Sequence, residues 1–197
     1  MSKTTSRRRR WAVVPLATLT TALALVTSAP AQAERSLFFE ETAEAFWAVP
    51  HQCADGSVVQ ATLLVRTTRD FTSPDTEDPD PTARVQYLAV CPDGTSFSWG
   101  APGVPATIVS TEDLKSVTAT GSGTARDNLG GVHQVTFDVT WTGVGPVETT
   151  VNGPGSMRKQ REATATGQVT FDGAVLVDGP ANHPTRPAPF IRIDTEK

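Results

Sequence analysis

Residues 133–141, His-Gln-Val-Thr-Phe-Asp-Val-Thr-Trp, alternate between side chains suited to a core and side chains suited to water. A period of two places successive side chains on opposite faces of a β-strand, so one face can pack in a core while the other is solvated. No segment after residue 42 shows a helical period. Strands are expected throughout the rest of the chain, at 43–50, 59–66, 85–91, 95–100, 105–110, 114–121, 162–171 and 174–177.

This succession of about ten short strands predicts an all-β fold, a two-layer antiparallel sandwich, because each strand's apolar face needs a second layer to cover it. A closed barrel is the less favoured alternative. The Pro-rich segment 179–189 should be extended, and 190–193 should form an edge strand or trail free, since a strand entered through proline suits an edge. The expected organisation is a signal peptide at 1–33, a sandwich domain at 34–178 and a C-terminal tail at 179–197.

The first 33 residues have the pattern of an export signal. Four arginines at 7–10 precede an uncharged apolar run from Trp11 to about Val26, and Ala31-Gln32-Ala33 fits a signal peptidase, with cleavage between Ala33 and Glu34. The run is shorter than the roughly 20 apolar residues of a spanning helix, which disfavours a retained membrane anchor. We therefore expect a secreted protein without a stable membrane anchor, exported by the general secretory route, with the twin-arginine route as an alternative.

The exported chain is expected to be strongly acidic. The full sequence has 17 Lys and Arg against 21 Asp and Glu, a net charge of −4. Removing residues 1–33 takes away Lys3 and the four arginines at 7–10 but no acid, which leaves a net charge of −9. Such a charge repels phosphates and argues against a nucleic-acid partner.

Cys53 and Cys91 are the only cysteines, and in an oxidising compartment they should form a disulfide. Each begins a similar turn, Cys53-Ala-Asp-Gly-Ser and Cys91-Pro-Asp-Gly-Thr, and Asp-Gly favours a tight hairpin. The bridge would clamp two hairpins, closing a loop of about 39 residues and stabilising the fold by roughly 4 kcal/mol. Free thiols or a metal site are the alternatives, although two cysteines without a pair of histidines are a poor metal set.

Two groups of side chains raise the question of metal binding. The acidic loop 75–80 offers four carboxylates, but it lacks the EF-hand spacing, so a solvated loop is favoured over a weak calcium site. His51, His133 and His183 show no metal-binding spacing and would have to converge in the fold to bind zinc or copper. His133 has the apolar phase of its strand and is expected to be a packed, hydrogen-bonded residue. No cofactor or metal ligand is assigned.

No catalytic motif is visible, and no catalytic residue is assigned: G-x-S-x-G is absent, and any triad would have to assemble from distant positions. An enzyme should place one of the three histidines beside a carboxylate or serine in a pocket. Trp47 and Trp141 are expected in the core, whereas Trp99 is the best candidate for an exposed aromatic. The basic cluster 157–161 should be a solvated hairpin tip, with docking of an acidic partner as the alternative.

The segment Trp141-Thr-Gly-Val-Gly-Pro146, together with the paired Cys-x-Asp-Gly hairpins and the signal peptide, resembles uncharacterised secreted β-rich proteins of bacteria over about residues 43–178. The resemblance implies an exported β-sandwich and no particular activity. The expected function is that of a secreted, non-catalytic binding or structural domain with an unknown extracellular ligand or protein partner. The alternatives are an extracellular hydrolase on a sandwich scaffold and a calcium- or carbohydrate-binding module.

Overall fold

In the computed structural model the chain divides into two units, Met1–Glu34 and Arg35–Lys197. The structure describes residues 38–72 and 80–196, which belong to the second unit. The expected signal peptide, its cleavage site between Ala33 and Glu34, and all of the acidic loop 75–80 except Asp80 lie outside the described residues.

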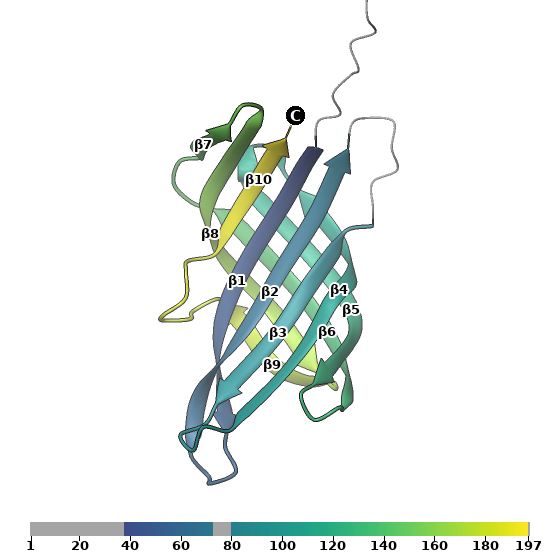
Figure 1. Cartoon of the computed structure of the whole chain (residues 1–197), viewed down its shortest axis with the longest axis vertical. Helices are drawn as coiled ribbons and strands as arrows, with labels where there is room; N and C mark the ends of the chain where they lie inside the picture. The colour runs from purple at the N-terminus through teal and green to yellow at the C-terminus, as the bar shows by residue number, and fades with distance from the viewer. Residues whose placement is uncertain (1–37, 73–79, 197) are drawn as a thin grey trace, which may run out of the picture. The chain divides into compact units, whose positions relative to one another are not determined.

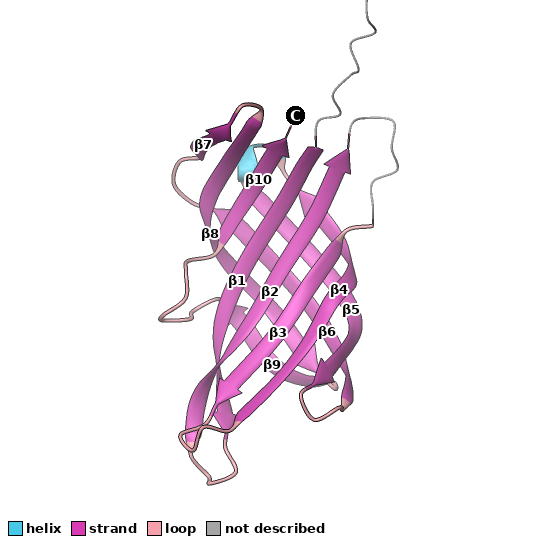
Figure 2. Ribbon diagram, in the orientation of Figure 1, coloured by secondary structure: helices cyan, strands magenta, loops and turns pink. Residues whose placement is uncertain are grey.

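Ten strands make up the described chain, which confirms the all-β prediction (Figures 1 and 2). The only helical segment there is the 3-10 turn Glu112–Leu114, and no helix of the described residues is long and apolar enough to span a membrane. The strands are β1 (Phe38–Gln52), β2 (Val58–Thr72), β3 (Thr82–Val90), β4 (Ser96–Ser110), β5 (Ser116–Asp127), β6 (Val132–Gly143), β7 (Glu148–Gly153), β8 (Ser156–Phe171), β9 (Ala174–Pro180) and β10 (Phe190–Glu196).

The strands form one antiparallel sheet that closes on itself as an eight-stranded barrel, so the predicted two-layer sandwich is wrong. Hydrogen-bonded neighbours follow the order β1-β2-β3-β4-β5-β6-β8-β10, and β10 pairs again with β1 (Figure 1). When a sheet curls into a barrel, the apolar side chains of each strand pack against strands on the opposite side of the same sheet. The alternation of side chains along each strand is the same in a barrel and in a sandwich, and for this reason the sequence pattern did not separate them.

Strand β10 holds the closing position rather than the edge position expected for residues 190–193. It pairs with Phe38–Glu44 of β1 on one side and with Ser156–Glu162 of β8 on the other. The proline-rich segment before it, expected to be extended, contains a turn at 184–186. Its last proline enters the strand without interrupting the ladder: the carbonyl of Pro189 accepts a hydrogen bond from the Ala163 backbone N–H at 2.8 Å. Prolines in the preceding segment therefore do not confine a strand to an edge.

In the half of the barrel that β10 does not reach, no described strand pairs with both β1 and β8. Residues 166–171 of β8 pair with β9, and β9 makes no ladder with the lower half of β1. Single contacts bridge this seam: Trp47 Nε1 donates to the Gly179 carbonyl at 3.1 Å, and the Ala48 N–H donates to Asn182 Oδ1 at 3.3 Å. Pro50, which has no N–H to offer, lies on the same free edge of β1, a position that suits proline.

The barrel interior is filled by side chains of the inward phase of each strand. Trp47 and Trp141 are both buried, as predicted, among valines and many alanines. Small residues let the strands approach each other closely. A Cβ at Gly167 would overlap the carbonyl oxygen of Asp138 and the Val139 side chain, and one at Gly121 would lie 2.7 Å from the Phe137 ring.

Gly167→Ala is expected to destabilise the barrel, because its Cβ would meet backbone that cannot move without disturbing the β6–β8 ladder. We expect a loss of about 1–3 kcal/mol in the free energy of unfolding, the usual cost of overpacking, measured by denaturant titration. Gly100→Ala is the matched control, because the nearest atom to its Cβ lies 3.9 Å away. Equal stability of the two variants would contradict the close approach at Gly167.

Candidate functional site

The hairpin end of the barrel, formed by the turns 53–57, 91–95, 127–131 and 172–173, carries the predicted disulfide. Cys53 and Cys91 are bonded, with Cα atoms 6.0 Å apart, which confirms the pairing. Their two turns repeat the same hydrogen bonds. Asp55 Oδ1 accepts from the Ser57 backbone N–H at 2.9 Å, and Asp93 Oδ1 accepts from the Thr95 N–H at 2.9 Å. The bridge therefore ties together the β1–β2 and β3–β4 hairpins.

Loss of this bridge should lower stability. Cys53→Ser/Cys91→Ser removes a cross-link over a separation of 38 residues, and such losses typically cost about 2–5 kcal/mol. The measurement is a thermal melt with and without reductant. The reductant should lower the Tm of the wild type and leave that of the double variant unchanged. Free thiols on the purified protein without reductant would contradict the bridge.

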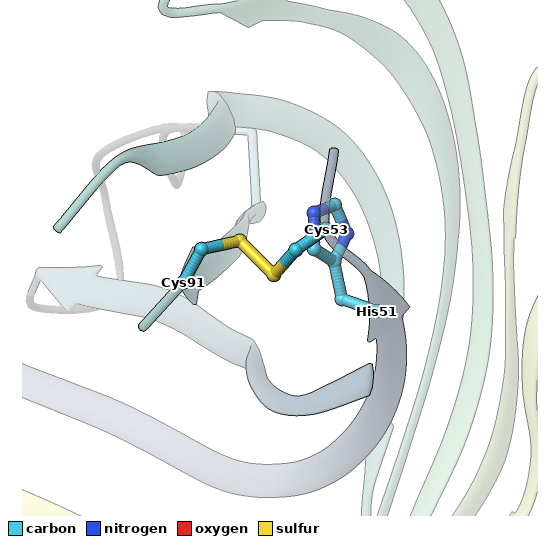
Figure 3. Close-up of side chains that lie close together, drawn as sticks. All are labelled: His51, Cys53 and Cys91. Carbon is cyan, nitrogen blue, oxygen red and sulfur yellow. A yellow bond between two sulfur atoms is a disulfide. The ribbon is translucent and has the colours of Figure 1, made fainter. Parts of the chain in front are cut away.

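His51 lies beside the disulfide, as Figure 3 shows. One ring nitrogen of His51 and the two sulfur atoms lie within 4.8 Å of one another. The two sulfurs are bonded to each other, so neither can bind a metal as a thiolate. The imidazole of His51 is then the one metal ligand that this group offers. A zinc or copper site would need all three histidines to converge, and the structure does not bring them together. His183 bonds to Thr62 on the outer face, and aromatic rings separate His51 from His133.

A layer of stacked rings closes the interior at the hairpin end. Trp99 lies between Tyr87 and Phe171, with centroid distances of 5.6 and 4.7 Å, and His133 packs on Phe171 at 4.4 Å. Trp99 is only 4% exposed, so its predicted exposure is wrong. It shares the inward phase of β4 with the buried Ala101, and the aromatic walls on both sides exclude it from the surface.

His133 is clamped between two carboxylates at the rim of this layer. Its Nδ1 lies 2.8 Å from Asp172 Oδ2 and its Nε2 lies 3.0 Å from Asp127 Oδ2. Hydrogen bonds from His133 to Asp172 and to Asp127 raise its pKa above the ordinary value. The same contacts lower the pKa of both carboxyls, which also accept backbone N–H bonds from Gln134 and from Leu129 and Gly131. His133 is thus a packed, hydrogen-bonded residue, as predicted, and both carboxylates favour its protonated form.

The other two histidines are also bonded within the protein. The Thr185 backbone N–H donates to His183 Nδ1 at 3.3 Å, so the ring proton lies on Nε2, which donates to Thr62 Oγ1 at 2.9 Å. His51 Nδ1 lies 3.0 Å from the Tyr87 hydroxyl. Burial raises the pKa of Tyr87 to about 12, so the phenol stays protonated at neutral pH. The histidine–carboxylate contact expected of an enzyme therefore exists at His133, but both of its nitrogens are occupied.

The basic cluster 157–161 lies within β8 rather than at a hairpin tip, and part of its charge is neutralised. Arg158 Nε pairs with Asp194 Oδ1 of β10 at 2.7 Å, and Arg161 Nη1 donates to the Asp113 carbonyl at 3.4 Å. Lys159 is exposed and, among the described residues, has no ion-pair partner. Of the three basic side chains in the cluster, Arg158 is the one with an ion-pair partner among the described residues, so docking of an acidic partner stays a prediction.

Hollows that could hold a ligand near these residues lie on the outside of the barrel. Two depressions of about 410 and 240 Å³ share Gln86 and Leu88 as lining side chains. The two depressions are neighbours on either side of β3, and we call them together the outer groove, which extends over β1 to β5. Its lining also includes Phe46, Thr62, Leu64, Ser98, Gly100, Arg126, Asp127, Asn128 and Arg186.

Strand register explains the shape of the outer groove. One cross-strand row runs Phe46–Leu64–Gln86–Gly100–Arg126, and the next runs Ala48–Thr62–Leu88–Ser98. Gly100 has no side chain, so the row is hollow between Gln86 and Arg126. Asn128 fixes one rim, because its Oδ1 accepts from the Ser98 N–H at 3.1 Å and its Nδ2 donates to the Ser96 carbonyl at 3.0 Å.

Sequence reasoning did not identify this groove. The residues come from five strands and from the 181–189 loop, and only the register aligns them. The available signal was the outward phase of Thr62, Leu64, Arg84, Gln86 and Leu88 on strands that were predicted. Comparisons with protein-family models, with curated proteins and with solved structures each found no significant match. The functional argument therefore rests on the geometry of the described residues.

The His133 clamp predicts a specific pH dependence of stability. A raised His133 pKa contributes stability that is present below the ordinary value of 6.5 and lost as the pH rises through the folded-state pKa. The lowered pKa values of Asp127 and Asp172 contribute stability that is present above 3.8 and lost as the pH falls through their folded-state values.

The Tm difference between wild type and His133→Gln should therefore be largest at about pH 5.5 and shrink by about pH 9, where the imidazole is neutral in both states. Thermal melts across this range measure it. A gap that stays constant with pH would show that His133 contributes only packing.

Proposed function

We propose that this protein is a secreted, non-catalytic binding module and that the outer groove holds its extracellular ligand. The observation that carries the proposal is the groove itself, a hollow across β1 to β5 with free polar groups over an apolar floor. The Ser98 hydroxyl makes no hydrogen bond within the described chain, and Leu88 is 43% exposed beside it. A few directional polar groups over apolar surface are what a ligand site needs.

A binding role is favoured over hydrolysis because most histidine ring nitrogens already have hydrogen-bond partners within the protein. Five of the six ring nitrogens bond to protein groups, and the carboxylates nearest to His133 accept backbone N–H bonds as well. A general base needs a free nitrogen within reach of a substrate proton. The filled interior supports the same choice, because it directs a ligand to the outer surface.

Secretion is supported by the disulfide, which persists in oxidising compartments. The outward face of the barrel carries exposed carboxylates, among them Asp138 and Asp178, as suits a protein that meets water on all sides of its described part. An extracellular ligand would reach the outer groove directly.

Gly100→Trp tests the proposal by filling the groove, since a Cβ at this position meets nothing closer than 3.9 Å. Val109→Trp is the control, because Val109 is 62% exposed on the same strand outside the groove. We expect at least one of a panel of soluble polysaccharides to raise the Tm of wild type and Val109→Trp by a few degrees, but not that of Gly100→Trp. Binding that is equal in all three proteins, or absent from the wild type, would overturn the proposal.

A further inference from the structure

Three arginines border the outer groove without an acidic partner. Arg126 and Arg186 line it, and Arg84 contacts its central residue. With the Gln86 amide oriented so that its oxygen faces Arg84, that oxygen accepts from Nε and Nη2 at 3.2 Å. Within the part of the chain that the structure describes, none of the three guanidinium groups forms an ion pair, although Asp and Glu outnumber Lys and Arg.

The strand register adds an unfavourable contact at the same place. Arg66 and Arg84 are directly opposite each other on β2 and β3, with both side chains on the outer face. Like charges in this arrangement repel. Glu40 forms an ion pair with Arg66 but not with Arg84: its Oε1 lies 3.8 Å from Arg66 Nη2, and the same oxygen lies 3.9 Å from Arg192 Nη2. A bound anion would relieve the repulsion that remains around Arg84.

The acidic group within the groove does not supply that anion. Asp127 is the carboxylate that lines the outer groove among the described residues, and its side chain is only 8% exposed. Its oxygens are directed to His133 and to the backbone of the 127–131 turn. The carboxylate of Asp127 therefore already has partners within the protein and does not pair with the three arginines.

We propose that the ligand of the outer groove is a linear acidic polysaccharide whose carboxylates pair with Arg84, Arg126 and Arg186. This inference rests on the proposed binding function. Guanidinium groups match carboxylates with two parallel hydrogen bonds, which makes such pairs stronger than neutral ones. Arg186 is already positioned for this role, because its Cζ lies 5.8 Å from the centroid of the Phe46 ring.

The floor of the groove favours a sugar chain over an acidic peptide. The groove crosses strands whose backbone is paired on both sides at Gln86 and Leu88, so it offers no free strand edge to a peptide backbone. It offers instead the Ser98 hydroxyl, the Gln86 amide nitrogen and the apolar surfaces of Leu64 and Leu88, which suit hydroxyl groups and the apolar faces of sugar rings. From β1 to β5 it spans roughly 19 Å, or four strand spacings.

Isothermal titration calorimetry of the purified protein tests the inference with three probes: polygalacturonate, neutral dextran and polyglutamate. We expect binding of polygalacturonate that weakens about tenfold when NaCl is raised from about 50 to about 500 mM. Arg126→Gln/Arg186→Gln should lower this affinity about tenfold or more. Lys159→Gln is the control for a positive charge lost outside the groove, since Lys159 is exposed on β8 away from the groove lining, and it should bind like the wild type.

The outcomes separate this inference from the proposed function. Dextran binding that Gly100→Trp abolishes and the arginine variants leave unchanged would overturn the acidic ligand while the binding groove stands. Equal binding of polyglutamate and polygalacturonate would overturn the choice of a polysaccharide. Polygalacturonate binding that Gly100→Trp leaves intact, or that falls equally in Lys159→Gln, would place the ligand elsewhere and overturn the inference. Binding of none of the probes by the wild type would overturn it as well.

Discussion

The backbone hydrogen bonds of residues 190–196 close the sheet, and the remaining structure depends on that closure. An open sheet of this size would leave β1 and β8 with unpaired N–H and C=O groups at its two edges, which invites pairing with other chains. Strand β10 satisfies both edges in the upper half of the barrel. In the lower half, β9 and the 181–189 loop cover β8 and contact β1 through side-chain and single backbone bonds.

Because the sheet closes, the inward side chains have to fill the interior of the barrel. Eight strands leave an interior that side chains can fill, and here the hairpin end is filled by the rings stacked around Trp99. His133 continues that stack but lies at the rim, half-buried, where ring nitrogens without partners would be costly. Asp127 and Asp172 provide them from two turns that the pairing of β6 with β5 and β8 brings together. A filled interior leaves the outer surface for recognition, and the outer groove lies where a cross-strand row lacks a side chain at Gly100.

The sequence predicts the local structure well and the global arrangement poorly, for physical reasons. Alternation identifies strands and their faces, so the burial of Trp47 and Trp141 and the hydrogen-bonded position of His133 follow from it. The repeated Cys-x-Asp-Gly turns predict the Cys53–Cys91 bridge because each turn is a local structure. Whether the opposite wall belongs to the same sheet depends on long-range pairing of residues 190–196, which carries no local signal. The burial of Trp99 was missed because its neighbour Gly100 suggested an open surface, although Phe97 and Ala101 share its phase.

The charge distribution gives the outer groove a property that no single residue supplies. An acidic protein repels a polyanion over most of its surface, because like charges repel. A polyanion can approach favourably only where positive side chains are locally in excess. Arg84, Arg126 and Arg186 form such an excess in this chain, whereas Arg66, Arg158 and Arg192 share ion pairs with Glu40 and Asp194 outside it. The surrounding carboxylates therefore contribute to specificity by disfavouring other orientations of an acidic chain. The same repulsion limits nonspecific adsorption, so a shallow site can select its ligand through the placement of three guanidinium groups rather than through depth.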